Sequence, residues 1–127
     1  MRELRLKNLF LTTAVVEVAT GLALLALPAI VLAFLLGIQS AIAETLLVGR
    51  ITGAALLAIG VASALARDDA GTPAQRGVLI SILLYDVLVA LLLVYSALVV
   101  QLVGPALWPA VALHTLLAGW CILCLRA

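Results

Sequence analysis

Residues 77–103 read GVLISILLYDVLVALLLVYSALVVQLV, and Asp86 is the only residue in this stretch that carries a formal charge. A helix needs roughly 20 apolar residues to cross a hydrocarbon core about 30 Å thick. A soluble domain of ordinary composition has about one charged residue in every four positions. The stretch therefore predicts a membrane-spanning helix with a carboxylate near its middle.

Three further apolar blocks, at residues 8–36, 43–66 and 105–125, meet the same length requirement. Hydrophobic residues make up 67% of the 127 positions and charged residues 10%, so little of the chain is left for a soluble domain. The predicted fold class is all-α: an integral membrane antiparallel four-helix bundle that forms a single domain over residues 1–127. Its helices are expected at about residues 8–27, 43–66, 73–102 and 105–126.

The first apolar block is longer than one crossing needs, and Pro28 interrupts it. Proline removes a backbone donor and clashes with the preceding turn, so two interpretations are open. Either the first helix is long and kinked, or it ends near Leu27 and Pro28 begins a short interfacial helix on the outer side. The second interpretation is favoured because proline costs little at a first helical position.

Two local motifs add detail to the other helices. Gly49 and Gly53 form a small-xxx-small motif, which lets two helix backbones approach closely, either within one chain or between copies. Thr72 as N-cap, Pro73 at the first helical position and Gln75 predict the start of the third helix.

Basic residues are distributed asymmetrically over the predicted loops. With the N-terminus inside, the outer loops carry no Lys or Arg, and the cytoplasmic side carries Arg2, Arg5, Lys7, Arg67, Arg76 and Arg126. Cytoplasmic loops of membrane proteins carry such an excess. We therefore expect a multi-pass protein of the bacterial inner membrane with both termini cytoplasmic. The net charge of +1 gives no reason to expect a nucleic-acid partner.

Four ionisable residues, Glu17, Arg50, Asp86 and His114, each occupy the interior of a different predicted helix, away from its ends. With a rise of about 1.5 Å per residue, all four fall within a few ångströms of the bilayer midplane. A charged residue at the centre of a membrane helix costs about 2.5 to 3.5 kcal/mol on insertion scales. These residues are therefore expected to face inward and to pair, with Arg50 bridging Glu17 and Asp86.

Two functions are compatible with this polar set. The favoured one is binding of a small lipophilic molecule, quinone-like or isoprenoid-like, in a polar midplane pocket, with conversion by acid–base or redox chemistry. The catalytic candidates are then Glu17, Asp86 and His114, and the ligand-binding candidates are Arg50, Tyr85, Thr13 and Thr20. The alternative is a non-enzymatic accessory or scaffold subunit of a membrane complex, whose polar network only fixes the arrangement of the helices.

His114 is the only histidine, which excludes bis-histidine haem ligation and a multi-histidine metal site within one chain. No metal site is predicted, and the sequence identifies no cofactor. Cys121 and Cys124 have the CxxC spacing of redox proteins but lack a thioredoxin-like context, so they are interpreted as small apolar residues of the last helix. The partners expected are the lipid bilayer and the lipophilic ligand, with homo-oligomers or larger membrane complexes left open.

Several short motifs carry a family resemblance. They are Glu17-x-x-x-Gly21, Pro28, Leu35-Leu36-Gly37, Arg50-x-x-Gly53 and Trp108-Pro109 followed by His114. In these the chain resembles the DoxX-like group of small four-helix bacterial membrane proteins. The resemblance implies the four-helix fold and a link to quinone or thiol redox chemistry, and it assigns no catalytic residue.

Overall fold

The computed structural model describes residues 1–126, except for the side chain of Arg2. Ala127, the last residue of the predicted domain, lies outside this range. The described residues form five α-helices and one short π-helix, with no β-strand among them: α1 (Arg2–Ala26), α2 (Pro28–Leu36), α3 (Ala43–Ala66), α4 (Pro73–Tyr95), η1 (Ser96–Val100) and α5 (Leu107–Arg126). Four segments are long and apolar enough to cross a membrane: Glu3–Ala26, Ala43–Ala66, Pro73–Val100 and Leu107–Arg126. The predicted all-α membrane bundle is confirmed.

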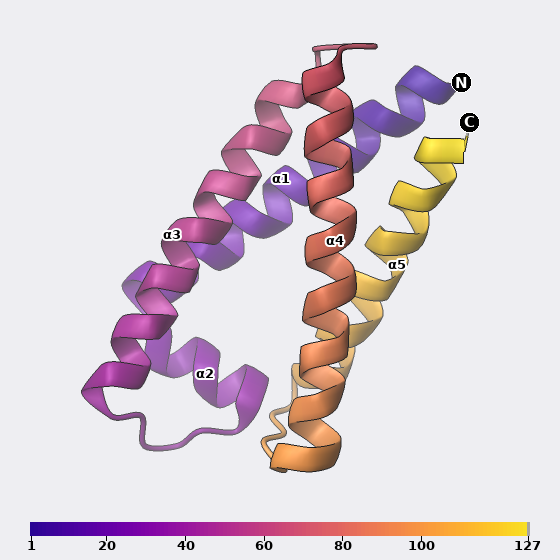
Figure 1. Cartoon of the computed structure of the whole chain (residues 1–127). Coiled ribbons are helices and arrows are strands. Elements are labelled where there is room, and N and C mark those ends of the chain that lie inside the picture. Colours follow the sequence, from indigo (N-terminus) through magenta and orange to yellow (C-terminus); the bar gives the residue numbers. More distant parts are fainter. Residues whose placement is uncertain (127) are drawn as a thin grey trace.

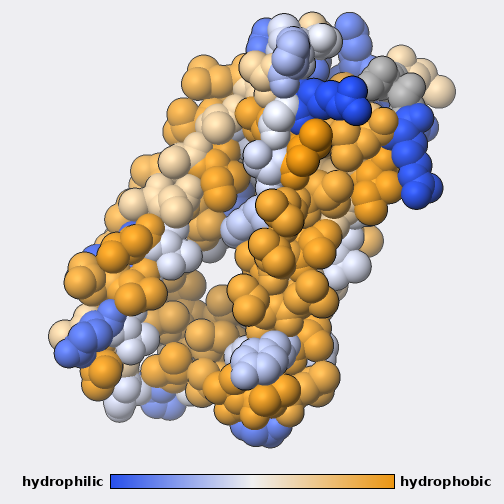
Figure 2. All heavy atoms as spheres, viewed as in Figure 1, coloured by the Kyte–Doolittle hydropathy of each residue, from blue (hydrophilic) through white to orange (hydrophobic). Residues whose placement is uncertain are grey.

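The spanning helices are arranged as two pairs, α1 with α3 and α4 with α5 (Figure 1). Both chain ends and the α3–α4 loop lie at one end of the bundle, which we call the terminal end. The pairs meet there, where α1 passes behind α4, and they diverge toward the opposite end, which we call the α2 end. Hydrophobic side chains cover most of the visible face between these ends (Figure 2).

Small residues hold α1 against α3. A Cβ atom added at Gly53 would lie 2.7 Å from the carbonyl oxygen of Gly21, and one added at Gly21 would lie 2.7 Å from the carbonyl oxygen of Gly53. A Cβ atom at Gly60 would meet Val18 at the same distance of 2.7 Å. Only glycine allows the two backbones to come this close. The small residues of α3 therefore pack against α1 of the same chain.

The proline interrupts the first apolar block in the way that was favoured. Helix α1 ends at Ala26, Leu27 leaves the helical conformation, and α2 begins with Pro28 at its first position. Helix α2 ends at Leu36 and is capped by Gly37, whose φ of 72° is the left-handed conformation that glycine adopts without strain. The chain therefore forms a separate short helix here rather than one long kinked helix.

Helix α2 is joined to the segment between η1 and α5 by backbone hydrogen bonds. The amide of Gly104 donates to the carbonyl of Leu35 at 3.1 Å, and the amide of Ala106 donates to the carbonyl of Phe34 at 2.9 Å. A side chain at position 104 would collide with Phe34. These bonds close the α2 end of the bundle.

The loop at the terminal end is fixed by the predicted cap. The Gln75 amide donates to the Thr72 hydroxyl at 3.1 Å. The Gln75 side chain also accepts from the Gly71 amide at 3.1 Å and donates to the Ala66 carbonyl at 2.9 Å. Gln75 thus joins the end of α3 to the start of α4 and limits how far these helices can separate here.

Candidate functional site

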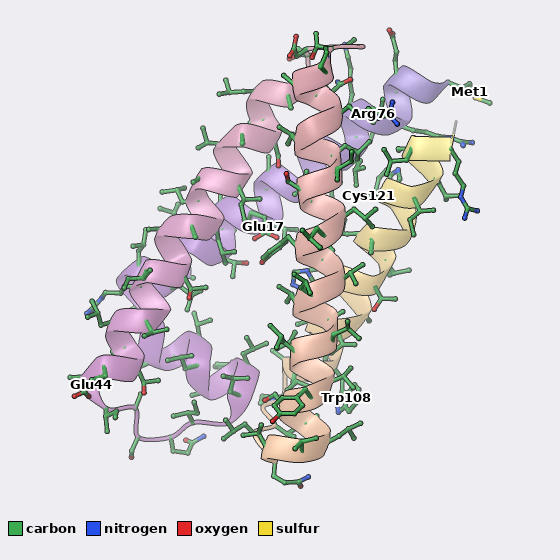
Figure 3. The ribbon with its side chains drawn as sticks, viewed as in Figure 1. Met1, Glu17, Glu44, Arg76, Trp108 and Cys121 are labelled. Atoms are coloured by element: carbon green, nitrogen blue, oxygen red, sulfur yellow. The ribbon has the colours of Figure 1, made fainter. Side chains whose placement is uncertain are left out.

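The candidate site lies where α1, α4 and α5 converge. A buried core fills this junction toward the terminal end, and its members include Leu9, Phe10, Ile82, Leu117 and Cys121. Glu17, Asp86 and His114 lie one or two helical turns beyond this core, each on a different one of the three helices. In Figure 3 the labelled Glu17 lies between α1 and α4, the helix that carries Asp86.

Short contacts join these three residues and Tyr85 into what we call the polar cluster. His114 Nδ1 lies 2.7 Å from Asp86 Oδ1, and the Tyr85 hydroxyl donates to Glu17 Oε2 at 3.3 Å. The rings of Tyr85 and His114 meet edge to face, with centroids 5.5 Å apart. Glu17 and Asp86 are each only 1% exposed and His114 is 9% exposed. The cluster is therefore a buried constellation on three helices.

Several polar atoms in and beside the polar cluster form no hydrogen bond. Glu17 Oε1 and Asp86 Oδ2 are buried and have no hydrogen-bond partner, and the same holds for the hydroxyl of Thr13. Thr13 lies one turn before Glu17 on α1 and is 1% exposed. A buried polar atom without a partner costs about 1 to 3 kcal/mol. An additional polar species at this place would recover that free energy.

The expected Arg50 bridge does not form. Arg50 is exposed, and its Nε donates to the backbone carbonyl of Leu25 at 3.2 Å. The register of α1 against α3 explains the difference, because Gly53 packs against Gly21 and Leu25. Arg50 therefore meets α1 near its last turn, about two turns beyond Glu17.

Arg50 has a separate structural task at that place. The last carbonyls of a helix have no intrahelical partner, and Pro28 cannot donate to them because it lacks an N–H group. A guanidinium near a helix C-terminus also interacts favourably with the helix dipole. Asp86 contacts His114 directly, in place of the Arg50 side chain that the sequence suggested.

The remaining predicted residues divide between the cluster and its surroundings. Tyr85 belongs to the cluster, and Thr13 lies beside it. Thr20 is partly buried on α1, and no hydrogen bond joins it to the cluster among residues 1–126. Cys121 and Cys124 are buried in the core without a disulfide between them.

An apolar groove of about 380 Å³ separates α3 from α4 next to the cluster. Its lining consists of Ile59, Ala62, Ala74, Gly77, Val78, Ser81 and Ile82. Tyr85 follows Ser81 and Ile82 by four and three residues, so it continues the same face of α4 by one turn. Beyond this level the two helix pairs stay apart, and Figure 2 shows an opening between them. Tyr85 thus stands between the groove and Glu17.

A second cavity of about 640 Å³ lies at the terminal end. Glu3, Lys7, Arg67 and Arg76 contribute charged side chains to it. Neither this cavity nor the groove is lined by Glu17, Asp86 or His114. The polar cluster therefore lies beside the groove rather than forming its wall.

Comparison with known proteins finds no matching family model, no matching curated protein and no matching solved structure. The resemblance to the DoxX-like group thus rests on the sequence motifs alone, and the site is interpreted from its own geometry.

Proposed function

We propose that this protein binds a small lipophilic molecule in the groove between α3 and α4, with the molecule's polar end at Tyr85 and Glu17. The observation that carries the proposal is the position of Tyr85, which continues the groove-lining face of α4 while its hydroxyl contacts Glu17. Ligand sites are mostly apolar cavities with a few polar groups that fix orientation. The groove supplies the first part and the polar cluster the second.

The chemistry of the cluster limits the class of ligand. An apolar chain or ring fits a lining made of Ile, Val, Ala and Gly. A carbonyl or hydroxyl oxygen at its end would exchange hydrogen bonds with the Tyr85 hydroxyl and the Glu17 carboxyl. Quinone-like and isoprenoid-like molecules have this form. The His114–Asp86 pair lies within reach to take up or return a proton, so acid–base conversion of the ligand is part of the proposal.

Two open glycines provide a matched test of the groove. A Cβ atom added at Gly77 or at Gly119 meets nothing within 4 Å, but only Gly77 lines the groove. We expect Gly77→Phe to fill the groove and to lose the lipophile that co-purifies with the protein, whereas Gly119→Phe keeps it. Mass spectrometry of organic extracts from protein purified in mild detergent measures the molar occupancy. Equal occupancy in both variants, or no stoichiometric lipophile in the unaltered protein, would contradict the proposal.

The alternative function is an accessory or scaffold subunit whose polar cluster only fixes helix positions. The burial of Glu17 and Asp86, each 1% exposed, favours this function, because a structural network needs no access. The same experiment separates the two, since a scaffold would carry no lipophile whose occupancy responds to Gly77→Phe.

We further propose that the terminal end faces the cytoplasm of a bacterial cell. The basic side chains of Lys7, Arg67, Arg76 and Arg126 belong to this end, as the positive-inside rule requires of a cytoplasmic surface. Single cysteines at Gln39 and Ala70 in a background without Cys121 and Cys124 test the orientation. A membrane-impermeant thiol reagent added to intact cells should label position 39 and not position 70, and the reverse pattern would contradict this orientation.

A further inference from the structure

Glu17, Asp86 and His114 have the composition and the spacing of a metal-binding site. Each offers one ligand atom, a carboxylate oxygen or a ring nitrogen, and these atoms lie within 4.8 Å of one another. Three ligands bound at about 2.0 to 2.2 Å from one ion, at tetrahedral angles, lie about 3.3 to 3.6 Å apart. Inward movements of less than about 1 Å would therefore bring all three side chains onto a common ion.

The unpartnered oxygens are an independent sign of an additional species. Glu17 Oε1 and Asp86 Oδ2 are buried without a hydrogen-bond partner, although their residues are 99% removed from solvent. A packing network built only to join helices would be expected to pair these atoms with donors. Each carboxyl group instead keeps one oxygen free beside its bonded one.

The charges in the cluster also suit a divalent cation. A divalent ion bound by two deprotonated carboxyl groups and a neutral imidazole forms a site without net charge, which suits membrane depth, where unpaired charge is expensive. Among the described residues, no Lys or Arg side chain forms an ion pair with Glu17 or Asp86, and Arg50 lies near the end of α1. A bound metal ion would therefore supply the positive charge that the neighbouring side chains do not.

We propose that Glu17, Asp86 and His114 bind one divalent first-row transition-metal ion, of the class of zinc, manganese or iron(II). A nitrogen ligand with two carboxylates suits these ions, whereas calcium takes six to eight oxygens and magnesium keeps several waters. Tyr85 and Thr13 lie next to the ligands, where their hydroxyls would hydrogen-bond the bound carboxylates and so hold them in place.

The sequence predicts no metal site, since the three ligands come from three helices and follow no ligand-spacing motif. The inference also goes beyond the proposed function, because the ion requires no lipophilic ligand. With an ion bound, His114 and Asp86 would serve as its ligands, and the ion would replace their proton exchange by polarising the oxygen of the lipophile. The metal experiment is therefore done on protein whose bound lipophiles have been removed by detergent exchange, and it leaves the Gly77→Phe result to be judged separately.

The test is metal stoichiometry in the full chain. Protein stripped with a chelator is incubated with zinc or manganese, passed through a desalting column and analysed for bound metal by mass spectrometry. We expect one ion per chain in the unaltered protein and at least a tenfold weaker affinity in Glu17→Gln and in His114→Gln, which remove a ligand while keeping the side-chain size. Glu44→Gln, which alters an exposed carboxylate in the first turn of α3, is the matched control and should bind normally.

Cobalt substitution gives a second measurement, in which the three proposed ligands stay unaltered. Cobalt(II) bound to the unaltered protein should show visible absorption bands of nitrogen and oxygen ligation, and the double variant Cys121→Ala, Cys124→Ala should show the same spectrum. A thiolate-to-cobalt charge-transfer band that disappears in the cysteine variant would assign binding to the cysteines and overturn the proposal. Absence of stoichiometric binding, or unchanged affinity in both ligand variants, would also overturn it.

Discussion

Helix α1 makes two contacts that differ in kind. Against α3 it packs backbone to backbone, with Gly21 opposite Gly53 and a spacing that excludes even a methyl group. Against α4 and α5 it presents Glu17, which reaches Tyr85 through a hydrogen bond between side chains. The first contact is sensitive to any added atom, whereas the second is sensitive to any lost partner.

This difference has a physical origin in the membrane. Lipid chains are as apolar as leucine, so helices in a bilayer associate through close packing and through polar side chains rather than through the hydrophobic effect. Helix α1 uses close packing against α3 and polar side chains against α4 and α5. The packing contact should be weakened by an added atom and the polar contact by a lost partner, which the following experiments compare.

The largest effect is expected in the polar cluster, to which α1 contributes Glu17. Asp86→Ala leaves His114 buried without its hydrogen-bond partner, which costs about 1 to 3 kcal/mol, and it also leaves a cavity in the cluster. Unfolding by a denaturing detergent, followed by circular dichroism, measures the change in unfolding free energy. Glu44→Ala, which removes an exposed carboxylate in the first turn of α3, is the control and should change it by less than about 1 kcal/mol. A loss below about 1 kcal/mol for Asp86→Ala would show that the contact does not hold the bundle together.

The packing contact should respond next. Gly53→Ala places a Cβ atom 2.7 Å from the Gly21 carbonyl, and such overpacking typically costs about 1 to 3 kcal/mol. Gly119→Ala is the matched control, because its Cβ atom meets nothing within 4 Å and the change favours helix formation. The same unfolding assay should therefore move in opposite directions for the two variants. Equal stability of both would mean that the α1–α3 contact is looser than described.

The smallest effect is expected at Arg50. Arg50→Met removes one hydrogen bond to the Leu25 carbonyl at an exposed position, which is worth about 0.5 to 1.5 kcal/mol. If Arg50 instead bridged the two carboxylates, its loss would cost about 3 to 5 kcal/mol. The unfolding assay thus distinguishes a cap on α1 from a counter-ion of the polar cluster. A loss in the larger range would restore the bridge that the sequence suggested.

The sequence specifies the helices far better than their contacts. Apolar length places the ends of α3 at Ala43 and Ala66 as predicted, and Pro28 marks the start of α2. Helix α1 begins at Arg2 rather than near residue 8, because a polar first turn can be helical without being apolar. The length of an apolar block and the position of a proline determine local structure, so they predict helix ends without knowledge of the neighbouring helices.

The candidate site could be predicted only in part, for a related reason. Counting residues from the helix ends predicts that Glu17, Asp86 and His114 lie at one level of the bundle, and the structure brings them together. The partner of each depends on how the helices rotate about their axes and slide along one another, which depth does not specify. The glycine packing of α3 shifts Arg50 to the end of α1, and Asp86 therefore pairs with His114. Neighbouring small residues in α3 were the available signal for this register.

The hydrogen bonds that close the α2 end have a consequence for biogenesis. Phe34 and Leu35 leave the ribosome long before Gly104 and Ala106, the residues that donate to their carbonyls. Until the segment that contains Gly104 and Ala106 has been translated, only water or lipid headgroups can donate hydrogen bonds to these carbonyls at the end of α2. Closure of this end is therefore a late event in assembly, and a nascent chain stopped before position 104 would be inserted but unclosed.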